Sequence, residues 1–203
     1  MKNLKDIILE RLHITKKTSI YNYFPKTKEE LVKILEERLA KDKNADLNDI
    51  DVSKITDMSY MFYGLNPHNI DISNWDVSNV TDMHQMFYGC YEFNSDLSNW
   101  DVSKVKDMYN MFIDCKNFNS DLSKWDVSNV TDAKQMFARC KIFNSDLSKW
   151  NVSNMIDMSF MFYECKNFNC DLSNWDVSKV EDMYCMFDKC TSLQNNPPKW
   201  YQK

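Results

Sequence analysis

Tryptophan recurs along this chain at an interval of 25 residues, with nothing inserted or deleted between its six occurrences. Five cysteines keep the same interval, and phenylalanine does so in two further series. A fixed period between about 20 and 50 residues is the signature of stacked repeats, in which each unit covers the apolar face of its neighbour. The sequence therefore predicts structural ladders of identical side chains, made by Trp75, Trp100, Trp125, Trp150 and Trp175 and by Cys90, Cys115, Cys140, Cys165 and Cys190.

The period divides the chain into six units over 46–195 and a C-terminal partial repeat at 196–203. Within the third unit, apolar and polar residues alternate over 100–103, which predicts a short strand. Apolar residues then stand at i, i+3, i+4 and i+7 over 108–115, which predicts a short helix that begins after Asp107. The expected fold class is an α/β repeat solenoid, similar to leucine-rich repeats, with one short strand and one short helix in each unit.

Residues 1–45 lie outside the period, and we expect them to form an N-terminal helical cap. A possible capping box at Thr27–Glu30 precedes apolar residues with helical spacing over 31–39, and a shorter apolar stripe covers Leu4, Ile7, Ile8 and Leu12. The cap would seal the first unit. The alternative is a helical docking element with a basic face, because this segment holds eleven Lys and Arg against seven Asp and Glu.

The charge and hydropathy of the chain exclude two classes of partner. The net charge is −5, and residues 46–203 carry fourteen basic and twenty-three acidic side chains, so we expect no nucleic-acid binding. No apolar run approaches the roughly 20 residues that span a bilayer, so we expect no membrane insertion. The longest apolar stretch near the N-terminus is too short for a secretory signal, and none is predicted in this chain.

The repeated unit resembles a known family. The stretch NWDVSNVTDMHQMFYGCYEFNSDLS at 74–98 is similar to the repeats of BspA-like leucine-rich-repeat surface proteins, and more narrowly to the mycoplasma lipoprotein-associated 25-residue repeat. The resemblance covers residues 46–200, and YNYFPKTKEELVKIL at 21–35 is similar to the cap that often precedes such arrays. It implies a bacterial surface module for protein recognition, often in adhesion, without enzyme activity.

The repeated cysteines and aspartates have structural explanations. Ladder cysteines serve as small buried hydrophobes, with disulfides between units or a zinc site as alternatives. The odd total of seven cysteines favours a reducing environment. Aspartate ladders cap turns, with calcium between units as the alternative. The three histidines share no motif, so no catalytic, cofactor-binding or metal-binding residue and no cofactor is predicted.

The positions at which the units differ indicate where a partner would bind. Variable positions beside the predicted helical stripe define a candidate interaction face, made by Tyr109, Ile113, Ile142, Phe160, Tyr163 and Tyr184, all expected to be exposed. The alternative face is the predicted strand, with Asn99, Asp101 and Ser103 and their equivalents. The expected function is recognition of a protein partner, with a cell-surface location implied by the resemblance and an intracellular partner-binding role as the alternative.

Overall fold

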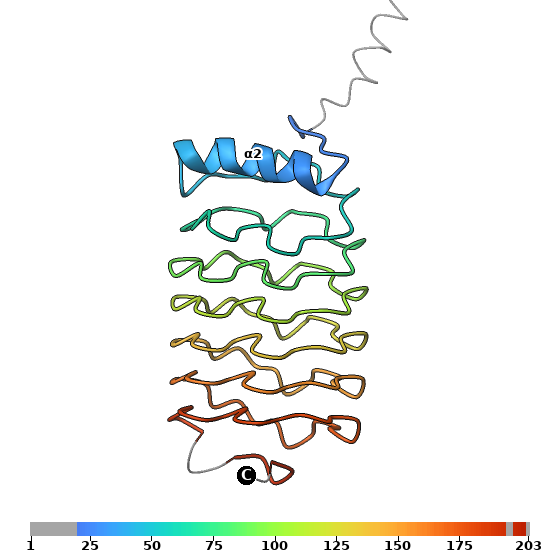
Figure 1. The fold of residues 1–203 in the computed structure, drawn as a ribbon, viewed down its shortest axis with the longest axis vertical. Helices are drawn as coiled ribbons and strands as arrows, with labels where there is room; N and C mark the ends of the chain where they lie inside the picture. The colour runs from blue at the N-terminus through green and yellow to red at the C-terminus, as the bar shows by residue number, and fades with distance from the viewer. Residues whose placement is uncertain (1–19, 194–196, 202–203) are drawn as a thin grey trace, which may run out of the picture.

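The computed structural model describes residues 20–193 and 197–201. Figure 1 shows flattened coils stacked on one another, with helix α2 (Lys28–Lys41) lying across the N-terminal end of the stack. One continuous hydrophobic cluster extends from α2 through every unit to Leu193. The predicted apolar stripe within 1–19 lies outside the described residues, as do positions 196, 202 and 203 of the partial repeat.

Helix α2 begins at a capping residue that the sequence identifies. Thr27 Oγ1 accepts a hydrogen bond of 3.3 Å from the Glu30 N–H, while Glu30 Oε2 accepts one from the Lys26 N–H at 2.7 Å. The helix buries Leu31, Leu35 and Leu39 against the first unit. These three side chains cover one apolar face of the first unit. The second unit covers the opposite face.

The prediction of an α/β solenoid similar to leucine-rich repeats is wrong. Within residues 20–193 and 197–201, α2 is the one helix, and no unit contains a helix or a strand. Parallel pairing is limited to isolated bridges between aspartates of successive units and one bridge between Tyr23 and Ile50. Each unit is instead a series of tight turns, and the units repeat without forming a sheet.

Left-handed residues prevent the predicted helix over 108–115. Asn110 and Asp114 have φ angles of 55° and 63°, a region that a right-handed helix never enters. Three successive turns close with hydrogen bonds from the Met111 N–H to Met108 O, from the Ile113 N–H to Asn110 O and from the Cys115 N–H to Phe112 O, each over three residues. Tight turns thus place the apolar residues on the inside at the same spacing that a helical stripe would have.

Aspartate side chains prevent the predicted strand over 100–103. The Ser98 N–H donates to Asp96 Oδ1 at 2.9 Å, and the Ser103 N–H donates to Asp101 Oδ1 at 3.0 Å. A turn between Leu97 and Trp100 and another after Val102 complete the segment. Asp and Ser side chains compete with ladder pairing for backbone donors, so the alternating pattern gives a pair of turns.

Parallel stacks of aromatic rings fill the core. Within a unit, Phe112 and Phe118 stack with ring centroids 4.1 Å apart, and between units Phe112 and Phe137 stack at 5.7 Å. The Trp75 and Trp100 indoles lie 6.4 Å apart with an angle of 3° between their planes. The repeat therefore acts through side chains, because each ring lies over its equivalent in the previous unit.

Candidate functional site

The outer edge of the stack consists of equivalent turn segments at 57–64, 82–89, 107–114, 132–139, 157–164 and 182–189. Alternate N–H groups along the first five segments donate to the next unit, as from Asn110 to Lys134 O at 3.0 Å and from Phe112 to Met136 O at 2.9 Å, while segment 182–189 accepts such bonds from 157–164. The intervening N–H groups close the local turns. This pairing fixes the backbone on both sides, so the outward side chains form regular columns that differ in residue type from unit to unit.

The predicted interaction residues do not all lie on one exposed surface. Tyr184 is 67% exposed, while Tyr109, Phe160 and Tyr163 are half-buried on the outer edge. Ile142 is 43% exposed but lies on a different turn, where it borders a shallow depression together with Asn94 and Asn117.

The prediction that Ile113 is exposed is wrong. Its exposed fraction is 5%, and Ala138 at the equivalent position of the next unit is buried as well. Tyr63 at that position in the first unit is 56% exposed. Exposure in this column follows side-chain length, because a short side chain lies within the stack while a tyrosine ring extends beyond it.

Aromatic rings gather at two places along the outer edge. The N-proximal cluster comprises Tyr60, Tyr63, His84 and Tyr88, with ring centroids 4.8 to 5.9 Å apart. The C-proximal cluster comprises Phe160, Tyr163 and Tyr184, with centroids 5.4 and 5.7 Å apart. Sequence reasoning missed the N-proximal cluster, although its members occupy the same variable positions in the first two units.

Charged side chains border the C-proximal cluster. Arg139 Nη1 lies 3.0 Å from Asp114 Oδ2, and Lys189 Nζ lies 2.8 Å from Glu164 Oε1. The Arg139 guanidinium is 6.0 Å and the Lys189 ammonium 4.9 Å from the centroid of the Tyr163 ring. The hydrogen bond from Lys189 lowers the pKa of Glu164, so this carboxylate stays charged beside the aromatic rings.

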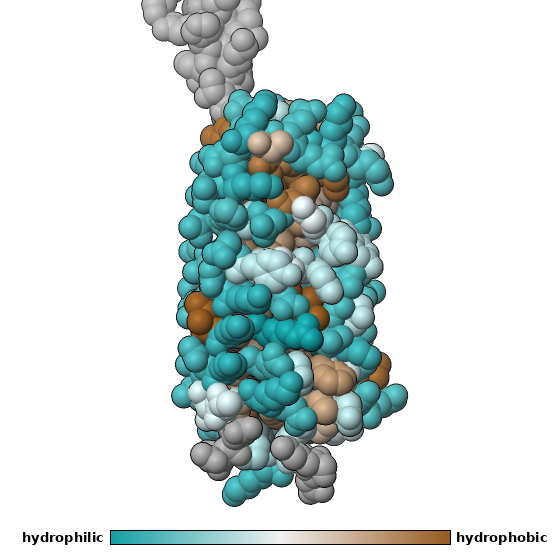
Figure 2. Space-filling model, turned by 60° about the vertical axis from the view of Figure 1, so that its left-hand side comes forward, coloured by the Kyte–Doolittle hydropathy of each residue, from teal (hydrophilic) through white to brown (hydrophobic). Residues whose placement is uncertain are grey.

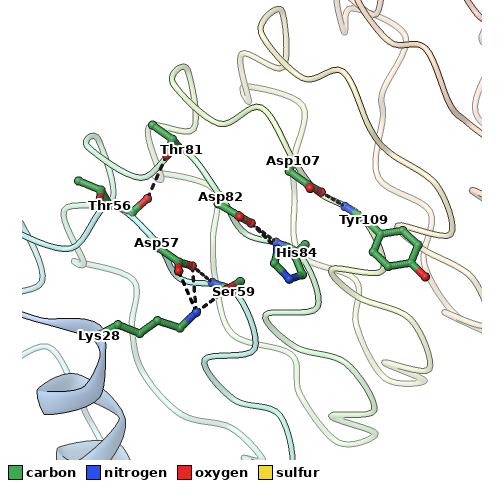
Figure 3. Close-up of polar contacts among 9 residues, drawn as sticks. All are labelled: Lys28, Thr56, Asp57, Ser59, Thr81, Asp82, His84, Asp107 and Tyr109. Atoms are coloured by element: carbon green, nitrogen blue, oxygen red, sulfur yellow. Dashed lines mark hydrogen bonds and ion pairs between the residues drawn. The ribbon is translucent and has the colours of Figure 1, made fainter.

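A column of aspartates runs along one side of the outer edge (Figure 3). Parallel bridges join each member to the next through Asp57, Asp82, Asp107, Asp132, Asp157 and Asp182. Each Oδ1 accepts the N–H two residues later, as Asp107 does from Tyr109 at 2.9 Å, so the predicted role of aspartates as turn caps is present here. Burial raises the pKa of Asp132, and the carboxylates of Asp107 and Asp157 add to the rise against the hydrogen bond from the Lys134 N–H.

One histidine faces this column. His84 Nδ1 lies 2.7 Å from Asp82 Oδ1, and a ligand atom from each of Asp82, His84 and Asp107 lies within 4.8 Å of the others. Sequence reasoning assigned no metal-binding residue and missed this group. The three residues come together only through the bridge between Asp82 and Asp107, and no linear motif records that bridge.

The predicted ladder residues all lie in the core. The five ladder tryptophans are at most 4% exposed, and each indole N–H donates to a carbonyl of the previous unit. The five ladder cysteines are at most 1% exposed, and all seven cysteines are free thiols. Cys115 Sγ donates to Phe87 O at 3.0 Å, and burial raises its pKa well above the usual value.

The alternative face around residues 99–103 is polar and tightly hydrogen-bonded. Asn99 and Asp101 are exposed and Ser103 is half-buried. Asp101 Oδ1 accepts the Ser103 N–H, and the Ser103 carbonyl accepts a hydrogen bond of 2.7 Å from Asn129 Nδ2. These side chains hold successive units together, and no exposed apolar group accompanies them in the described residues of this segment.

Comparison with known proteins identifies a family. None of the helices in the described part of the chain is long and apolar enough to cross a membrane. Searches of curated proteins and of solved structures found no match to this chain. A family model described as "Mycoplasma protein of unknown function, DUF285" matches residues 30–141 and 120–203, which supports the mycoplasma part of the resemblance and does not extend it to leucine-rich repeats. The chain therefore belongs to the DUF285 family of mycoplasma proteins, whose function is not established.

Proposed function

We propose that the chain is a non-enzymatic scaffold that recognises a protein partner through its outer edge, at the surface of a bacterial cell. The proposal rests on the exposure of tyrosine side chains at the outer edge. The inward-facing residues of the same turns are nearly the same in every unit. Tyr60, Tyr63 and Tyr184 are 47%, 56% and 67% exposed, whereas the phenylalanines of the same turns are at most 6% exposed.

Exposed aromatic rings suit protein recognition. Tyrosine and arginine are enriched among the residues that dominate binding energy, because they bring a large contact area with few rotatable bonds. The C-proximal cluster adds Arg139 beside Tyr163, which is the pairing that such surfaces use. Figure 2 shows apolar residues as separate brown patches, with pale residues of intermediate hydropathy nearby, among hydrophilic residues on one face of the stack.

The rigidity of the edge also supports recognition. Backbone hydrogen bonds to neighbouring units hold the outer turns along their length, and the turn at 182–189 is held by the unit before it, so the exposed rings lose little backbone freedom when a partner binds. The body of the chain is acidic, with fourteen basic and twenty-three acidic residues over 46–203. A protein partner with a neutral or basic contact surface fits this charge.

A matched variant tests the proposal. The substitutions Tyr60→Gln, Phe160→Gln, Tyr163→Ala and Tyr184→Ser each install a residue that another unit carries at the equivalent position, so the fold is retained. The control variant carries Lys124→Ala and Lys149→Ala, two exposed positions on the turns before Trp125 and Trp150. Purified wild-type protein, edge variant and control variant are used to capture partners from membrane and soluble fractions of the source bacterium and from host matrix.

Capture of one defined protein by the wild type and the control, with at least about tenfold weaker binding by the edge variant, is the expected result. Equal binding by the edge variant would refute recognition through the outer edge. The seven free thiols favour the alternative, an intracellular partner-binding role. Protease treatment of intact cells separates the two locations: loss of the protein supports the surface, and full protection supports the interior.

A further inference from the structure

Lysine side chains pair with some members of the aspartate column and not with others. At its N-terminal end, Lys28 Nζ lies 3.0 and 3.1 Å from the two carboxylate oxygens of Asp57 and also donates to Ser59 Oγ. Further along, Lys134 Nζ lies 3.8 Å from Asp157. Among the described residues, no lysine or arginine nitrogen lies within ion-pair distance of Asp82 or Asp107. The carboxylates of Asp82 and Asp107 therefore lie in adjacent units, and no described lysine or arginine pairs with either of them.

The first unit shows what this backbone geometry accepts. Asp57 and Ser59 have the same relation as Asp82 and His84, because in both pairs the aspartate Oδ1 accepts the N–H two residues later. The ammonium of Lys28 sits on the Asp57 carboxylate and contacts the side chain of Ser59 (Figure 3). A cation bound between an aspartate and the second following side chain is thus already present in this protein, one unit away.

His84 changes which cation the second unit can accept. The equivalent positions hold Ser59, Tyr109, Lys134, Ser159 and Tyr184, so an imidazole meets two carboxylates at one place in the described column. The His84 side chain is 26% exposed, its Nδ1 lies 2.7 Å from Asp82 Oδ1, and its ring packs edge-on against Tyr60 at 4.8 Å. The imidazole is therefore held next to the carboxylate and remains open to solvent.

We propose that Asp82, His84 and Asp107 bind one divalent transition-metal ion such as Zn²⁺. One ligand atom from each lies within 4.8 Å of the other two, which suits coordination around a single ion after small side-chain movements. An imidazole nitrogen with two carboxylate oxygens favours zinc over magnesium and calcium, which prefer oxygen ligands alone. Three protein ligands leave at least one coordination position for water.

The five ladder cysteines do not compete for this ion in the folded protein. The five ladder thiols are at most 1% exposed, and burial raises the pKa of each above its usual value, to about 12 for Cys90 and about 11 for Cys190. Metal ligation requires the thiolate. A histidine and carboxylate site can therefore be distinguished from adventitious thiol binding by spectroscopy.

The experiment uses the full chain without a histidine tag, freed of metal by chelation and dialysis. Calorimetric titration with Zn²⁺ is expected to give one site, and His84→Ser and Asp107→Asn are each expected to weaken it at least about tenfold. Serine is the residue that the first and fifth units carry at this position, so His84→Ser keeps the turn intact. His68→Ser is the control and is expected to bind Zn²⁺ as the wild type does.

Cobalt provides the second readout. Co²⁺ bound at this site is expected to show d–d absorption without the thiolate charge-transfer band of cysteine coordination. Absence of saturable Zn²⁺ binding by the wild type would overturn the proposal. Unchanged binding by His84→Ser or a thiolate band with Co²⁺ would also overturn it, since either result places the ion elsewhere. Binding of Ca²⁺ in preference to Zn²⁺ would overturn it too, since it would show that the carboxylates bind the ion without the imidazole.

Discussion

The Trp125 indole N–H donates a hydrogen bond of 2.9 Å to the carbonyl oxygen of Leu97 in the previous unit. The same bond recurs from Trp75, Trp100, Trp150, Trp175 and Trp200, always to the carbonyl 28 residues earlier. Each tryptophan thus joins its unit to the one before through a ring and a donor together. Tryptophan meets both needs with one side chain, which gives a physical reason for its regular recurrence.

Truncation of a central tryptophan should be more costly than truncation of the last one. We expect Trp125→Ala to lower the free energy of unfolding by about 3–5 kcal/mol, because it removes a buried ring and leaves Leu97 O without its indole donor. Trp200→Ala should cost clearly less, since Trp200 is half-buried at the end of the stack. Urea denaturation of both variants measures the difference, and equal losses would contradict a stack whose last unit is less covered.

The glycines are predicted to matter for their backbone angles alone. Gly89 has a φ of 69°, and a methyl group added there would meet no atom within 4 Å. We expect Gly89→Ala to cost about 1 kcal/mol of stability from backbone strain. Gly89→Asp should cost less, because Asp114 holds the equivalent position with a φ of 63° and aspartate tolerates this region. Thermal unfolding checks the order, and an unchanged midpoint for Gly89→Ala would contradict it.

Two aspartates should respond oppositely to neutralisation. Hydrogen bonds from the Ser103 hydroxyl and N–H lower the pKa of Asp101, so its charged form stabilises the fold above the unfolded-state pKa of about 4, and this contribution is lost as pH falls. Asp132 has a raised pKa, so its stabilising form is the protonated one, which is lost as pH rises through the folded-state value. We therefore expect Asp101→Asn to lower stability at pH 7 and Asp132→Asn to raise it.

Denaturation of both variants at pH 7 and at pH 3 provides the measurement. At pH 3 the two differences from wild type should shrink, because both carboxyl groups are then largely protonated in the unfolded chain. Asn151 occupies the position equivalent to Asp101 and accepts the Ser153 N–H at 3.2 Å, so the asparagine retains the turn. A loss of stability from Asp132→Asn at pH 7 would show that the aspartate column is not a source of repulsion.

Thiol reactivity should separate the ladder cysteines from Cys170. Cys170 replaces the serine of earlier units, is half-buried and accepts the Leu147 N–H at 3.2 Å, while its pKa is raised to about 11 by burial. The five ladder thiols are buried more deeply. A disulfide reagent at pH 8 is expected to label Cys170 far sooner than these five, which should react only when the protein unfolds. Mass spectrometry of the labelled peptides checks this, and early labelling of Cys115 or Cys140 would contradict it.

The sequence was sufficient for some features and misleading for others. Thr27 and the apolar residues after it predicted a capped helix, because both signals are local. The spacing of Met108, Met111, Phe112 and Cys115 predicted a helix that does not exist, because apolar spacing records which side chains face inward and not the sign of φ. The only two glycines, Gly64 and Gly89, stand at equivalent positions with positive φ and were a signal for turns.

Other features could not be read from the sequence. Tyr60 and Phe160 also adopt positive φ, where bulky residues rarely occur. The conformational preferences of these residue types therefore do not predict the turns. The exposure of Tyr63 and the burial of Ile113 at equivalent positions depend on how far each side chain extends beyond the stacked backbone, which only the structure shows. The group formed by Asp82, His84 and Asp107 depends on a bridge between units, which only the stacked structure provides.

The repeated units share one hydrogen-bonded arrangement, in which N–H groups of the turns bond to the next unit. Scalar coupling across hydrogen bonds, measured by long-range HNCO spectroscopy on isotope-labelled protein, tests it directly. Coupling is predicted from the Phe112 amide nitrogen to the Met136 carbonyl carbon and from Asn110 to Lys134. Coupling from Phe112 to the Met108 carbonyl, as a helix would give, would contradict this arrangement of turns.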